Sequence, residues 1–147
     1  MNIKRYFSEE EINEIITAIK YAELNTSGEI RVHIEKFCKE NSLDRAAYVF
    51  AKLNMHKTKL RNGVLFYLAI EDHKFAVLGD SAINQKVPED TWISMINKMT
   101  IIFKEGKLSS GLAQGIKIAG ELLKLYFPYQ SDDKNELPDE ISFGENI

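Results

Sequence analysis

The feature that most constrains the fold is an apolar hairpin, RNGVLFYLAIEDHKFAVLGD, at residues 61–80. Its first arm, residues 63–70, is apolar at both odd and even positions, so a β-strand there presents hydrophobic side chains on both faces. Such a strand belongs inside a sheet that helices cover on both sides. Glu71 and Asp72 provide a polar turn, and we expect the second arm to return over residues 74–78.

Helical patterns flank this hairpin on both sides in the sequence. Ser8 and Glu11 form an S-x-x-E capping box, and apolar residues then recur at helical spacing as far as Ala22. Further helices are predicted to begin at three places, which are Ser42, Pro88, and Ser109 or Ser110. Gly111 and Gly115, four residues apart in the last helix, either let another element approach closely or only weaken the first turn.

A first strand is predicted at residues 28–35, where apolar and polar residues alternate. The polar positions are Arg31, His33 and Glu35, which indicates a strand with one solvated face or a strand at the sheet edge. The element order is then α-β-α-β-β-α-α. We expect an α/β fold, a three-layer αβα sandwich with a small mixed sheet.

The chain divides by charge into a body and a tail. Residues 128–147 hold six acids and one base, a net charge of −5, whereas the first 127 residues hold 18 bases and 16 acids, a net charge of +2. We expect a domain at residues 1–128 and a flexible acidic tail at 129–147. The apolar tail residues could instead dock on the body or on a partner; they are Leu137, Ile141 and Phe143.

Composition excludes several classes of protein. The nearly neutral body has no general electrostatic footprint for nucleic acid. No run approaches the ~18 apolar residues of a membrane helix, and the N-terminus lacks the apolar core of a signal peptide. Cys38 is the only cysteine, which excludes an intrachain disulfide and fits a reducing compartment. We therefore expect a soluble, cytoplasmic protein without a membrane span, whose partner is an unidentified protein or small ligand.

Polar residues should gather at one end of the sheet. A strand-helix-strand connection is nearly always parallel, so residue 28 should begin beside residue 63, and the hairpin returns residue 80 to the same end. We name this predicted end of the sheet the rim. Its members are Thr26, Ser27, Glu29, Thr58, Lys59, Arg61, Asn62 and Asp80.

The rim has the chemistry of a divalent-cation site. Two carboxylates, Glu29 and Asp80, near an amide and hydroxyl groups suit Ca²⁺ or Mg²⁺. The basic run that contains Lys59 and Arg61 could hold a phosphate beside the cation, and His56 could serve there as a general acid. The alternative is structural: each carboxylate caps a turn or pairs with a neighbouring base.

Several separated stretches resemble the TPM domain family, which includes thylakoid-lumen proteins linked to photosystem repair and many bacterial proteins. The matching stretches are TSGEIRVHI (26–34), NGVLFYLAIEDHKFAVLGDSAI (62–83), the tryptophan at 92, FKEGKLSSGLAQGI (103–116) and YFP (126–128). The tail stretch NELPDEISFG (135–144) resembles the ending of small soluble bacterial members.

The resemblance implies an αβα sandwich, a divalent-cation site in some members, and an acid phosphatase activity attributed to plant members. Carried over by position, it selects Glu29, Asp80 and Asn62 as metal-site residues. The chain departs from the family where many members have Gly-x-Gly, since it reads LGDSA there, and it shows neither a membrane anchor nor a low-complexity tail.

Two functions follow as hypotheses. The first is a binding module for Ca²⁺ or Mg²⁺ at Glu29, Asp80 and Asn62, with Thr26, Ser27, Thr58, Lys59 and Arg61 as possible ligand or phosphate contacts. The second is a weak metal-assisted phosphomonoesterase, for which the sequence offers no obvious nucleophile.

Overall fold

The apolar hairpin forms part of a four-stranded sheet in the computed structural model, which describes residues 2–129 and 136–144. The first arm, β2 (Gly63–Ala69), is buried along its whole length. It pairs antiparallel with β3 (Lys74–Gly79) and parallel with β1 (Glu29–Glu35). Beyond β1 lies a short parallel strand, β4 (Ser142–Phe143), so the order is β3-β2-β1-β4.

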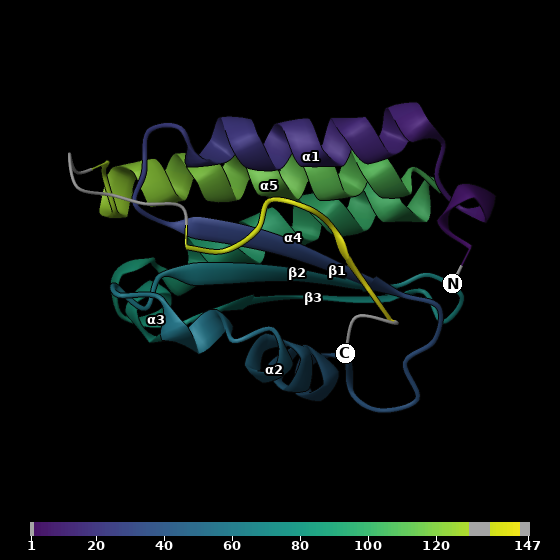
Figure 1. Ribbon diagram of the computed structural model, residues 1–147, viewed down its shortest axis with the longest axis horizontal. Coiled ribbons are helices and arrows are strands. Elements are labelled where there is room, and N and C mark those ends of the chain that lie inside the picture. Colours follow the sequence, from purple (N-terminus) through teal and green to yellow (C-terminus); the bar gives the residue numbers. More distant parts are fainter. Residues whose placement is uncertain (1, 130–135, 145–147) are drawn as a thin grey trace.

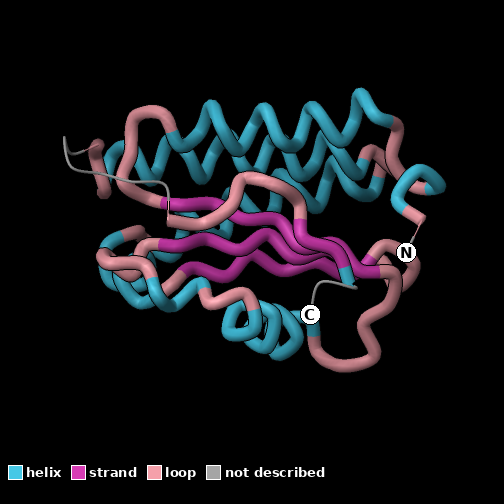
Figure 2. Tube along the Cα trace, in the orientation of Figure 1, coloured by secondary structure: helices cyan, strands magenta, loops and turns pink. Residues whose placement is uncertain are grey.

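Helices cover both faces of this sheet, which confirms the predicted αβα sandwich (Figure 1). One face packs against α1 (Glu9–Glu23), α4 (Glu89–Lys104) and α5 (Leu108–Tyr126). The other packs against α2 (Ser42–Lys52), and Figure 2 shows the strands between the two helical layers. The alternation in β2 divides its side chains between two cores: Val64, Phe66 and Leu68 in one, Leu65, Tyr67 and Ala69 in the other.

Short polar signals set most helix boundaries. The Ser8 capping box is present as predicted, with both reciprocal hydrogen bonds to Glu11. The cap of α2 is Asn41, one residue before the predicted Ser42, and its side chain accepts two backbone N–H groups. The pattern missed α3 (Ser81–Lys86), a single short helix capped by Asp80. Two 3₁₀ turns complete the chain, η1 (Ile3–Arg5) and η2 (Met55–Lys57).

Glycines let α4 and α5 approach each other closely, the first of the two readings given for Gly111 and Gly115. A Cβ at Gly111 would lie 2.4 Å from the ring of Phe103, and one at Gly115 would lie 2.4 Å from the sulfur of Met99. Larger residues at these positions would push the helices apart. Within the described residues, no helix combines the length and apolar character that a membrane crossing requires.

The C-terminal segment, defined here as residues 136–144, lies on the body of the protein. Leu137 and Ile141 are buried, and β4 pairs with His33 and Ile34 of β1. Figure 1 shows this segment, in yellow, crossing in front of β1. Residues 130–135 and 145–147 of the predicted flexible tail lie outside the described residues, and the division at residue 128 stays a prediction.

The expected solvated face or edge position of β1 is wrong. His33 is fully buried and Glu35 is 6% exposed, because α2 and the C-terminal segment cover the polar face of the strand and β4 continues the sheet. The polar side chains of His33 and Glu35 therefore lie in the interior of the protein, on the side of the sheet that α2 covers.

Candidate functional site

The parallel pairing of β1 and β2 assembles the rim. Glu29 pairs with Gly63, and its N–H donates to the carbonyl of Asn62 at 3.4 Å. The N–H of Asp80 donates to the carbonyl of Gly63 at 2.9 Å. Both predicted acids therefore flank the same residue of β2.

Glu29 is buried with one oxygen satisfied. As the first residue of β1 it points away from the core that α1 and α5 share with Ile30, and it is 3% exposed. Its Oε1 accepts a hydrogen bond from the N–H of Leu137, and the nearby backbone N–H of Glu136 also acts to lower the pKa of this carboxyl. Its Oε2 is buried and has no hydrogen-bond partner among the residues that the structure describes. Burial raises the pKa of Glu29 to about 7, and the charges of Glu136 and Asp139 add to this effect.

Asp80 accepts three hydrogen bonds from the protein. Its two oxygens each lie 2.8 Å from a guanidinium nitrogen of Arg61, and Oδ1 also accepts the N–H of Ser81 at 2.7 Å. Arg61 has a left-handed backbone, φ 53°, and its side chain is half exposed. Asp80 thus joins the loop before β2 to the start of α3.

Two other predicted contacts fasten the 24–28 turn to the end of α5. The Thr26 hydroxyl lies within hydrogen-bonding reach of the carbonyls of Leu123, at 2.9 Å, and of Phe127. The Ser27 hydroxyl donates to the carbonyl of Phe127 at 3.4 Å and accepts from the amide of Asn62 at 3.3 Å. These groups hold the turn in place.

The remaining predicted contacts lie in the loop before β2. Thr58 is buried, and its hydroxyl has no hydrogen-bond partner in the part of the chain that the structure describes. The Lys59 backbone N–H points at the carboxylate of Glu136, 3.3 Å from the nearer oxygen. Lys59 thus contacts the C-terminal segment through its backbone.

The C-terminal segment brings two more acids, Glu136 and Asp139, to the rim. The sequence pattern did not predict their position there. Glu23, at the end of α1, hydrogen-bonds to Asp139, and its Oε2 accepts the N–H of Ile30 at 2.7 Å. Burial and the Asp139 carboxyl together raise the pKa of Glu23 to about 9. We name the four acids, Glu23, Glu29, Glu136 and Asp139, the acid cluster.

Backbone N–H groups hold two carboxyl groups of the acid cluster in place: Leu137 donates to Glu29, and Ile30 donates to Glu23. Across residues 2–129 and 136–144, no three His, Cys, Asp or Glu side chains surround one point closely enough to hold a metal ion. In the cluster, burial and neighbouring carboxyl groups raise the pKa of Glu23 and Glu29, and one buried oxygen of Glu29 has no hydrogen-bond partner among the described residues.

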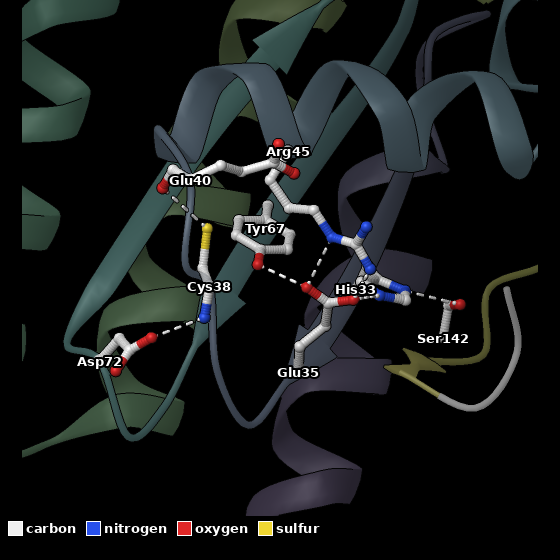
Figure 3. A network of polar contacts seen from close by, with 8 residues as sticks. All are labelled: His33, Glu35, Cys38, Glu40, Arg45, Tyr67, Asp72 and Ser142. Carbon is white, nitrogen blue, oxygen red and sulfur yellow. Dashed lines mark hydrogen bonds and ion pairs between the residues drawn. The ribbon is translucent and has the colours of Figure 1, made fainter.

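A second polar network lies further along β1, around Glu35 (Figure 3). Arg45 of α2 donates to both carboxylate oxygens, Tyr67 of β2 donates its hydroxyl to Oε2, and Nε2 of His33 lies 3.3 Å from Oε1. Although burial acts to raise it, the hydrogen bonds from Arg45 and Tyr67 hold the pKa of Glu35 below its ordinary value. We name this group the Glu35 network.

Cys38 and His56 have structural surroundings in the described part of the chain. Cys38 lies near Tyr67, donates its backbone N–H to the carboxylate of Asp72, and donates its thiol to the carbonyl of Glu40. His56 lies in η2 and is exposed. Neither residue forms a nucleophile and base with a partner among these contacts.

Comparison with known proteins identifies the relatives of this chain. A family model described as the TPM domain matches residues 3–122. The NMR structure of the BA42 protein from the psychrophilic bacterium Bizionia argentinensis is similar, with 47% identity, a TM-score of 0.90, and coverage of 97% of this chain and 99% of that chain. The comparison with curated proteins gives no match. The chain belongs to the TPM domain family.

Proposed function

We propose that this TPM domain binds a divalent cation, Ca²⁺ or Mg²⁺, at the acid cluster. The observation that carries the proposal is the Oε2 atom of Glu29, which is buried and has no hydrogen-bond partner within residues 2–129 and 136–144. A buried carboxylate oxygen without a partner is costly, and native proteins rarely leave one unless a ligand, ion or proton satisfies it.

The raised pKa values in the acid cluster are consistent with carboxyl groups that lack a positive counter-charge. The pKa of Glu23 is raised to about 9 and that of Glu29 to about 7, so near neutral pH protons partly take the place of a counter-charge. A divalent cation would replace these protons and relieve the repulsion between the acids. Binding of the cation would therefore compete with protons.

The ligand types fit a hard cation. Ca²⁺ accepts about six to eight oxygen atoms in a flexible geometry, whereas Mg²⁺ needs a stricter octahedron. The residues that would hold the ion are Glu29 together with Glu23, Glu136 and Asp139, and the side-chain oxygens of Asn62 and Thr58 lie in the same region of the rim. Since the present arrangement does not surround one point, binding requires the C-terminal segment to adjust.

Asp80 enters this proposal as a weaker ligand than Glu29. Its carboxylate already accepts three hydrogen bonds from Arg61 and Ser81, and a cation would have to compete with the guanidinium. We propose that Asp80 and Asn62 shape the rim, while Glu29 anchors the ion.

The test is calorimetric titration of chelator-treated protein with CaCl₂ and MgCl₂. Wild-type protein should bind at least one of the two ions, and Glu29→Gln and Asp139→Asn should each weaken binding about tenfold or more. The control is Glu140→Gln, which removes one charge from the exposed neighbour of Asp139. No binding by the wild type, or equal binding by Glu29→Gln, contradicts the proposal.

Hydrolysis of a phosphomonoester remains the alternative function. The half-exposed Arg61 already pairs with Asp80, so a phosphate would have to compete with that carboxylate. Turnover of an aryl phosphate by wild-type protein that is lost in Asp80→Asn would support the enzyme, and unchanged turnover in that variant would assign the activity elsewhere.

A further inference from the structure

The C-terminal segment has a second attachment point, far from the acid cluster, where it meets a buried histidine. The imidazole of His33 is fully buried, and its Nδ1 lies 2.9 Å from the hydroxyl of Ser142 in β4. On its other side Nε2 faces Glu35 at 3.3 Å, and the ring stacks near Tyr67 with centroids 6.1 Å apart (Figure 3). One side chain thus bridges the sheet and the docked segment.

The partners of His33 define its hydrogen-bonding state. An ionised carboxylate can only accept, so the nitrogen that faces Glu35 carries the proton. The neutral ring then has a lone pair on Nδ1, and the Ser142 hydroxyl donates to it. In this state Nδ1 is hydrogen-bonded to Ser142, while Nε2 faces Glu35 at 3.3 Å without forming a hydrogen bond of good geometry among the described residues, and the imidazole carries no net charge.

Protonation of His33 disturbs this arrangement. Both ring nitrogens become donors, so the Ser142 hydroxyl must turn and accept, and its own proton loses its acceptor. The charge that would stabilise an imidazolium is also engaged, because Glu35 already pairs with Arg45. Burial lowers the pKa of His33, although Glu35 acts to raise it, and the positive charges of Arg45 and Arg31 lower it further.

The groups that face His33 come from four elements. Glu35 and Arg31 lie on β1 itself, Arg45 on α2 and Tyr67 on β2. The C-terminal segment brings the Ser142 hydroxyl, while Glu140 acts on Arg31. Undocking the segment removes its cover from His33 and admits water, but it leaves Glu35 in place on the same strand.

We propose that His33 is a pH-operated latch, which holds the C-terminal segment while neutral and releases β4 when it is protonated. The released state binds the proton more readily, because water then solvates the imidazolium and Glu35 remains beside it. Docking is therefore favoured above the ordinary histidine range, near pH 6.5, and is progressively lost as the pH falls below it. The latch needs no cation and stands apart from the proposed function.

The test measures amide hydrogen exchange of residues 141–143 in chelator-treated protein from about pH 7.5 to about pH 5, corrected for the intrinsic pH dependence of exchange. The variants are His33→Gln, which cannot titrate, and His56→Gln, which removes an exposed histidine as a matched control. Amides of β2 serve as the internal reference for global stability.

The hydrogen-exchange protection of residues 141–143 in the wild type, divided by that in His33→Gln, should decrease as the pH drops under about 6.5. The decrease should reach at most about tenfold per pH unit, the limit for one linked proton. His56→Gln should follow the wild type. A ratio that stays constant across the range overturns the latch.

A measurement on wild-type protein covers the case in which His33→Gln does not fold. The ¹⁵N shifts of the His33 ring should report a neutral, Nε2-protonated imidazole at neutral pH that titrates below the ordinary histidine value. Titration of His33 at or above that value, with β4 still docked, also overturns the proposal.

Discussion

Two glutamates on the same face of β1 have opposite electrostatic surroundings in this fold. Glu29 and Glu35 stand six residues apart and are similarly buried, at 3% and 6% exposure. Glu35 receives Arg45 and Tyr67, which hold its pKa below the ordinary value, whereas the pKa of Glu29 rises to about 7 among other acids. Where the chain supplies the counter-charge, a buried carboxylate is part of the structure. Where it does not, the carboxylate is a candidate site for a ligand.

The largest expected effect comes from removing the counter-charge of Glu35. Arg45→Met should lower the free energy of unfolding by about 3 kcal/mol, the lower end for breaking a buried ion pair, because the guanidinium is 26% exposed. Urea denaturation at neutral pH measures this loss. Arg61→Met, which removes a half-exposed guanidinium from the buried carboxylate of Asp80, is the control and should cost about 1 kcal/mol. Equal losses in the two variants would remove the distinction between the networks.

An intermediate effect is expected from Glu29 in the absence of divalent cations. A carboxyl whose pKa is raised in the folded state stabilises the fold below its ordinary value of 4.5, and this stabilisation is lost as the pH rises to about 7. Glu29→Gln should remove this pH dependence and exceed wild-type stability above pH 7 by about 1–3 kcal/mol. Denaturation curves at a series of pH values, with chelator present, give the comparison. A variant less stable than wild type throughout would mean that the charged form of Glu29 is well accommodated.

The smallest effect is expected at Asp80. Asn caps helices about as well as Asp, so Asp80→Asn should lose mainly the pair with Arg61 and cost below about 1 kcal/mol. If Glu29 anchors the cation, the affinity for Ca²⁺ should change by less than about threefold, or ~0.7 kcal/mol. A tenfold loss of affinity in Asp80→Asn would move the site from the acid cluster to the predicted pair of Glu29 and Asp80.

The sequence was informative where a single local rule decides the outcome. The two-sided apolar pattern of residues 63–70 predicted a covered central strand, and the usual parallel alignment of strands joined through a helix predicted the pairing that places Glu29 beside Gly63. For Asp80 the structural alternative, a cap and an ion pair, is present in the fold. Its predicted role as a metal ligand stays a prediction.

The parts that could not be predicted depend on contacts between distant segments. A strand of two residues, such as β4, leaves no periodicity to detect, so nothing indicated that Ser142 would cover His33. For the same reason Glu136 and Asp139 were assigned to a flexible tail, although they contact Lys59 and Glu23. The alternation in β1 indicated a polar face correctly, but only tertiary packing decides whether such a face meets water.

The most direct test of the central claim is crystallographic. Crystals soaked in Mn²⁺, which replaces Ca²⁺ or Mg²⁺ and scatters anomalously, should show an ion about 2.0–2.6 Å from a carboxylate oxygen of Glu29, with Glu136 or Asp139 among its other ligands. An anomalous peak bound by Asp80 alone, or no peak at the rim while Leu137 keeps its hydrogen bond to Glu29, would contradict the account.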